Sequence, residues 1–147
     1  MKIENLKGCF WTAKKIENTY IVSVHEGISL VAGLLNFILD QKLPAGKISG
    51  VSVASDIVFR FFNQFDKKYE FGEFPGKDEI LNVLGSFLIM HGELRLSLEA
   101  SLKRGGNINM AAQLTDAKIS GVNKFFFHPV NTLITASKDE ELRLRMN

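Results

Sequence analysis

The sequence predicts an α+β domain in which one main helix is followed by a series of strands. Residues 28–41 carry apolar side chains at the three- and four-residue spacing of one helix face. From residue 47 onward the apolar pattern alternates with a period of two, which is typical of strands. The chain has 147 residues and no repeat with a period of about 20–50 residues, so one domain spanning 1–147 is expected.

The helix is expected over residues 28–41. Ser29 is a candidate N-cap, because a serine oxygen accepts a hydrogen bond from a backbone N–H of the first turn. Pro44 ends the helical segment, because proline disfavours helical geometry in the residue before it. The run 20–24, rich in β-branched and aromatic residues, predicts a strand leading into the helix.

After the helix, turn residues divide the chain into strands. The polar run 66–68 marks the turn of a hairpin over 56–73, and His91-Gly92 marks a second turn. A helix is expected again at 139–145. The expected strands are 47–53, 56–65, 69–71, 79–90, 94–102, 108–114 and 124–127.

Residues 94–102 alternate most cleanly. One face is apolar and belongs to the core: Leu94, Leu96 and Leu98. The other face is expected to meet something polar: Arg95, Ser97, Glu99 and Ser101.

Composition excludes several classes of protein. The single cysteine, Cys9, forms no intramolecular disulfide and no thiolate zinc site, which leaves His25, His91 and His128 as imidazole candidates. None of these histidines is spaced as a metal ligand, so turn, strand-end or helix-approach positions are expected. The N-terminus lacks the apolar core of a signal peptide, and no apolar run of about 18 residues occurs. A soluble, cytoplasmic protein without membrane contact is expected.

Several short motifs occur in a familiar order. They are Glu26-Gly27 before the helix, Gly46 to Gly50 in a strand, Tyr69, Glu79-Ile80, Leu84-Gly85 and Gly92. In this order they resemble the plant and prokaryote conserved (PPC) domain, which accompanies AT-hook motifs in plants and stands alone in bacteria and archaea. The resemblance implies one mixed, mostly antiparallel sheet with a main helix packed on it, and a homotrimer. It also implies a core at 20–128 and a C-terminal extension at 129–147.

The resemblance also implies a site. Stand-alone members usually hold a metal with three histidines, whose positions fall here on Ser97, Glu99 and Gln113. Serine and glutamine are weak neutral ligands and Glu99 is a single carboxylate, so no metal and no cofactor are expected. A small polar ligand pocket is expected instead, with an oxygen-liganded cation, an ordered water or nothing bound in it. Its possible neighbours are Arg95, Asn109 and Lys124.

Three functions follow. The first is a non-enzymatic trimeric interaction or ligand-binding module, with itself, a protein or a small ligand as partner. The second is a DNA-binding or DNA-associated regulatory protein. Intrinsic DNA affinity should be weak or absent, because 18 basic and 16 acidic residues are interspersed and the Arg-Gly-Arg-Pro of an AT-hook is missing. The third is an enzyme that uses a polar pocket around Glu99.

The 12 Phe residues are expected in the core and at a subunit interface.

Overall fold

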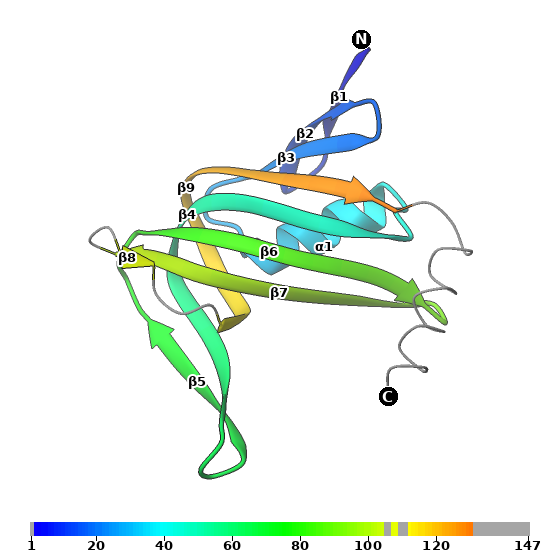
Figure 1. Ribbon diagram of the computed structural model, residues 1–147. Coiled ribbons are helices and arrows are strands. Elements are labelled where there is room, and N and C mark those ends of the chain that lie inside the picture. The colour runs from blue at the N-terminus through cyan, green and yellow to red at the C-terminus, as the bar shows by residue number, and fades with distance from the viewer. Residues whose placement is uncertain (1, 105–106, 109–111, 131–147) are drawn as a thin grey trace.

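The computed structural model describes residues 2–104, 107–108 and 112–130, which form one helix and one sheet (Figure 1). The helix is α1 (Leu30–Asp40). The strands are β1 (Ile3–Lys7), β2 (Trp11–Ile16), β3 (Thr19–Val24), β4 (Ala45–Asn63), β5 (Lys68–Phe74), β6 (Glu79–Met90), β7 (Glu93–Arg104), β8 (Asn107–Ile108) and β9 (Ala112–Pro129). The predicted α+β class is confirmed, whereas the helix expected at 139–145 lies outside the described residues. In the described part of the chain, no helix has the length and apolar character needed to cross a membrane.

The strands follow the order β1-β2-β3-β9-β4-β6-β7-β8, with β5 paired to β4 beside this path. All pairings among the described strands are antiparallel, so the sheet expected to be mixed is antiparallel in these residues. The last strand, β9, lies between β3 and β4, in the middle of the sheet. The helix prediction over 28–41 and the hairpin prediction over 56–73 are both confirmed, the first with Ser29 as the N-cap.

The strand boundaries differ from prediction in three places. β1 and β2 were not predicted, yet they extend the sheet and place Trp11 in the core. β4 runs through both 47–53 and 56–65, because a β-bulge region shifts the register without ending the strand. Asp56 lies there with φ 49°, a left-handed conformation that aspartate tolerates. β9 likewise joins the end of the segment expected at 108–114 to the one expected at 124–127.

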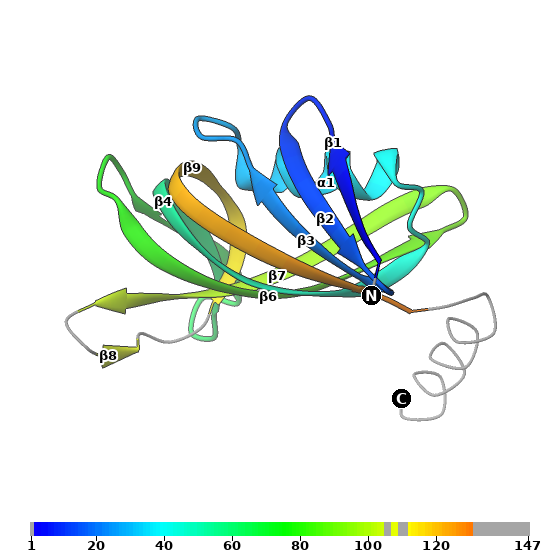
Figure 2. The ribbon, with the colours of Figure 1, turned by 90° about the horizontal axis from the view of Figure 1, so that it is seen from above.

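The core lies between α1 and one face of the sheet (Figure 2). Phe37 of α1 is fully buried, and its ring lies 4.8 Å from Trp11, 5.3 Å from Tyr20 and 4.8 Å from Phe127, measured between ring centroids. Such aromatic pairs are worth about 0.5–1.5 kcal/mol beyond their buried area. The helix is therefore held on β2, β3 and β9 by one aromatic cluster.

The start of α1 is tied to β9. The Ala32 N–H donates to Ser29 Oγ at 3.1 Å, which is the expected cap. The Ser29 hydroxyl in turn donates to the Asp116 carboxylate at 2.7 Å, and the Val31 N–H donates to Asp116 Oδ1 at 3.2 Å. A carboxylate beside the first helical N–H groups is favourable, because the helix dipole is positive there. The strand thus fixes where the helix begins.

Candidate functional site

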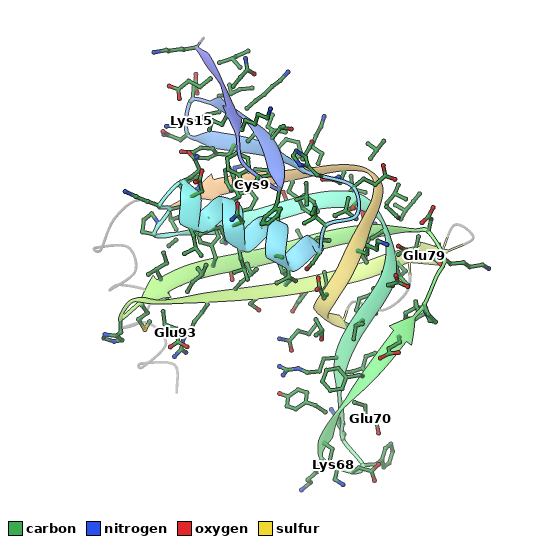
Figure 3. The ribbon with its side chains drawn as sticks, turned by 180° about the vertical axis from the view of Figure 1, so that it is seen from behind. Cys9, Lys15, Lys68, Glu70, Glu79 and Glu93 are labelled. Atoms are coloured by element: carbon green, nitrogen blue, oxygen red, sulfur yellow. The ribbon has the colours of Figure 1, made fainter. Side chains whose placement is uncertain are left out.

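The sheet face opposite α1, called the open face below, carries the polar residues of β7. Figure 1 views this face, and Figure 3 views the molecule from behind, with α1 in front of the strands. Ser97 and Glu99 are exposed on the open face, whereas Leu98 between them is buried on the helix side. The alternation predicted over 94–102 is confirmed.

Strand register builds two cross-strand rows on the open face. The first row crosses four strands through His128, Lys47, Ser86 and Ser97. The second row is its neighbour and runs through Phe126, Ser49, Leu84 and Glu99. Residues directly opposite in an antiparallel pair lie on the same face with neighbouring side chains. Ser97 and Glu99 therefore share their surroundings with residues that are distant in the sequence, on β4 and β9.

These two rows surround an open hollow of about 490 Å³. Its lining residues are Lys47, Ile48, Ser49, Leu84, Gly85, Ser86, Ser97, Glu99 and His128. Gly85 is required by close packing between β6 and β7. A Cβ at Gly85 would lie 2.4 Å from Leu98 Cδ2 and 2.7 Å from the Ser97 carbonyl oxygen. The absence of a side chain at Gly85 therefore allows β7, and with it Ser97, to lie close to β6.

The hollow offers hydrogen bonds and charges rather than strong metal ligands. Three serine hydroxyls, the Lys47 ammonium, the His128 imidazole and the Glu99 carboxylate line it. In the described part of the chain, no group of three His, Cys, Asp or Glu side chains could hold a metal ion. Ser97 and Gln113 are weak neutral ligands and Glu99 is a single carboxylate, so these three residues do not form a donor set that suits a transition metal. The arrangement suits a polar organic ligand.

Gln113 is held elsewhere. It lies opposite Glu99 in the β7–β9 register and opposite Arg60 in the β4–β9 register. Arg60 Nε and Nη2 both donate to Gln113 Oε1, at 3.2 and 2.8 Å, and the guanidinium lies 4.3 Å from the centroid of the Tyr69 ring. Gln113 is thus beside Glu99 in the sheet, while its amide oxygen is engaged by Arg60. It does not line the hollow that contains Ser97 and Glu99.

The three possible neighbours lie in different places. Arg95 Nη2 is 3.9 Å from Glu93 Oε2 in an exposed ion pair near the β6–β7 turn. Lys124 lines a second hollow, of about 600 Å³, with Lys14, Ser23 and residues of β1 and β2. Asn109 lies outside the described residues. Of the predicted site residues that the structure describes, Ser97 and Glu99 lie in one hollow, whereas Arg95, Gln113 and Lys124 do not line it.

Sequence reasoning missed Lys47, Ser49, Ser86 and His128 as lining residues. Alternation over 47–53 already placed Lys47 and Ser49 opposite the core residue Ile48. Their position beside Ser97 depends on the order β9-β4-β6-β7 and on the register of each pair. No local pattern specifies either. Arg60 interrupts an apolar run, and this was the only sequence signal that its side chain contacts Gln113 and not the core.

Solved structures with the same architecture were found. A Bacteroides thetaiotaomicron protein named "putative DNA binding protein" is 26% identical, with a TM-score of 0.76, over 84% of this chain and 86% of that chain. A plant- and prokaryote-conserved (PPC) protein of Pyrococcus horikoshii is 19% identical, with a TM-score of 0.68, over 86% of each chain. A metal-containing protein of Archaeoglobus fulgidus is 16% identical, with a TM-score of 0.68, over 78% of this chain and 81% of that one.

No family model and no curated protein matches the chain. The likeness therefore rests on three-dimensional structure, over more than three quarters of the chain in each case. It agrees with the order of short motifs from Glu26-Gly27 to Gly92. The chain has the fold of the plant and prokaryote conserved domain.

Proposed function

We propose that this protein is a non-enzymatic homotrimeric module that binds a small polar ligand in the hollow of the open face. The observation that carries the proposal is the exposed leucine in the middle of that face. Leu84 stands between Ser49 and Glu99 in the sheet and is 64% exposed, and Val51 on β4 is 44% exposed. The resemblance to PPC domains supplies the number of subunits.

Apolar exposure at the centre of a sheet favours association. Burying a leucine or valine side chain contributes about 1.5–3 kcal/mol, so a second copy that covers Leu84 and Val51 gains free energy. The polar hollow lies next to these side chains. A neighbouring subunit would therefore cover part of the hollow and turn an open surface into a more enclosed pocket.

The lining residues define the class of ligand. Lys47 and His128 donate from one side of the hollow, Ser49, Ser86 and Ser97 both donate and accept, and Glu99 accepts. This set suits a small molecule with hydroxyl or amide groups and mixed charge. No reaction is proposed, because among the described residues no hydrogen bond or ion pair joins Glu99 to Lys47, His128 or a serine of the hollow, as a positioned acid–base pair requires.

Size-exclusion chromatography with light scattering tests the trimer. At micromolar concentration the mass should be three times the 16.5 kDa of one chain. Leu84→Ser should lower the mass toward one chain. The matched control is Leu39→Ser, because Leu39 is 57% exposed but lies on α1, away from the open face. A wild-type protein that elutes as a monomer would contradict the proposal.

DNA binding is the second candidate. The Bacteroides structure bears that name, and Lys14, Lys47 and Lys124 line the two hollows. A net charge of +2 gives little general attraction to phosphate. A gel-shift experiment with duplex DNA at low salt decides the question. No shift at protein concentrations above about 10 µM, where even non-specific complexes form, would remove this candidate.

A further inference from the structure

The β4–β5 hairpin projects from the body of the protein as an arm, defined here as residues 57–74 (Figure 3). Lys68 and Glu70 lie near its far end. Large apolar side chains on the arm are exposed: Phe61 at 42%, Phe65 at 98%, Tyr69 at 57% and Phe71 at 61%. An aromatic surface of this kind marks an interaction site rather than an ordinary turn.

The base of the arm is covered by the chain's own core. Ile57 and Phe59 are buried, and the Phe59 and Phe74 rings meet edge-on at 5.8 Å between centroids. Among the described residues, the β4–β9 pairing extends to Arg60 and Gln113, and residues 61–63 of β4 pair with β5 alone. A two-stranded ribbon in water is marginally stable. The outer half of the arm therefore gains most from being covered.

The arm does not hang loosely from the sheet. Arg60 fixes its base through two hydrogen bonds to Gln113 and a cation–π contact with Tyr69. One register row then continues from the body into the arm, through Glu99, Gln113, Arg60 and Phe71. Phe71 consequently belongs to the same side of the sheet as the open face. Because paired strands hold the arm extended, it cannot fold back over its own Leu84.

The open face of a second copy of the chain offers apolar side chains that can cover the exposed aromatic rings of the arm. Phe61 follows Arg60 in the strand and therefore lies on the opposite side of the arm from Phe71. Weighted by exposed fraction, Phe65, Tyr69 and Phe71 present on the order of 320–540 Å², taking about 150–250 Å² per aromatic side chain. A specific interface of standard size buries about 800 Å² per partner. These three side chains therefore supply about half of one side of such an interface. The open face supplies apolar side chains for the other side, at Val51, Ile80 and Leu84.

We infer that the arm of one copy packs its aromatic side chains on the open face of a second copy. This inference rests on the homotrimer proposed above and assigns the contact that makes it. The contact is heterologous, since an arm meets a different surface, and repeated contacts of this kind close into a ring when the rotation permits. In a trimer each chain gives one arm and receives one, next to the hollow that contains Glu99.

Removal of exposed rings tests the contact. The variant is Phe65→Ser/Phe71→Ser, and the control is again Leu39→Ser on α1. Light scattering should show a threefold fall in mass for the double variant and no change for the control, with circular dichroism verifying the fold. If the double variant keeps the wild-type oligomeric mass, the arm inference is wrong while the trimer stands. If wild type is monomeric, both fail.

Cross-linking gives a second readout, in which the arm keeps Phe65 and the open face keeps Val51 and Ile80. In a Cys9→Ser background, Phe71→Cys is co-expressed with a tagged chain carrying Leu84→Cys, so any disulfide between these sites joins two copies. The control pairs Phe71→Cys with Leu39→Cys. A disulfide-linked tagged pair should form with Leu84→Cys and not with Leu39→Cys. Equal yields from the two pairs, or no product from an oligomeric protein, would overturn the inference, and an arm bound to a different protein would give that result.

Discussion

Asn123 is a buried amide whose replacement by alanine should strongly destabilise the fold. Its side chain is 8% exposed and joins β9 to the end of β3. The Val24 N–H donates to Asn123 Oδ1 at 2.7 Å, and Asn123 Nδ2 donates to the Val24 and Gly121 carbonyl oxygens at 2.9 and 3.1 Å. Asn123→Ala removes all three hydrogen bonds and leaves the two backbone groups of Val24 without these partners in a buried place.

The magnitude follows from those two groups. Each buried polar group left unsatisfied costs about 1–3 kcal/mol, and water entry relieves part of the cost, so a loss of about 2–4 kcal/mol is expected. A domain of this kind has a total stability of about 5–15 kcal/mol. The loss is therefore a large part of the free energy of unfolding and is easily measured by urea denaturation.

The matched control is Asn82→Ala. Asn82 is an exposed asparagine on β6, and its replacement should change the free energy of unfolding by no more than about 0.5 kcal/mol. If Asn123→Ala lost less than about 1 kcal/mol, the hydrogen bonds would contribute much less than this reasoning requires. The same holds if both variants lost the same amount.

Two further predictions concern the helix start and the altered metal positions. Asp116→Ala should lower the free energy of unfolding by about 1–2 kcal/mol, because the Ser29 hydroxyl and the Val31 N–H lose their acceptor. The control is Asp40→Ala, at the other end of α1, which should change the free energy of unfolding by no more than about 0.5 kcal/mol. Equal losses in urea unfolding would contradict the role given to Asp116. Ser97→His/Glu99→His/Gln113→His should gain one zinc per chain in a calorimetric titration, because residues 99 and 113 are Cα partners and 97 lies on the same face. Wild type should bind no stoichiometric zinc, and a triple variant that stayed without metal would refute the matching of these positions.

The parts of the fold that sequence predicted are those with a strong local pattern. The apolar spacing of α1 with Ser29 before it, and the alternation of β7, each arise from neighbours in the chain. The His91-Gly92 turn is equally local, since both residues have positive φ, at 52° and 76°. β1 and β2 were not predicted, because the sequences of short strands that contain lysine differ little from those of polar loops. The prediction divided β4 into two strands near Asp56, because a β-bulge within a strand and a turn between two strands have similar sequences.

The candidate site was predictable only where it depends on one strand. Ser97 and Glu99 share a face because they are two residues apart in β7. The partners of these residues depend on register between distant strands, which placed Lys47 and His128 beside them. Gln113 was expected in the same pocket as Ser97 and Glu99. It contacts Arg60 instead, because β4 pairs with β9 at these two residues.

The position of β9 in the middle of the sheet sets the order in which the protein can form during synthesis. β3 and β4 are complete by residue 63, but each has its neighbour in a strand that ends at residue 129. Until a ribosome has released that strand, both facing edges have no partner, and a buried contact such as Val24 to Asn123 must wait for 99 further residues. Long-range pairing of this kind makes folding slow. The nascent chain therefore exposes two central strand edges while residues 64–129 are being synthesised, and aggregation or chaperone binding competes with folding during that interval.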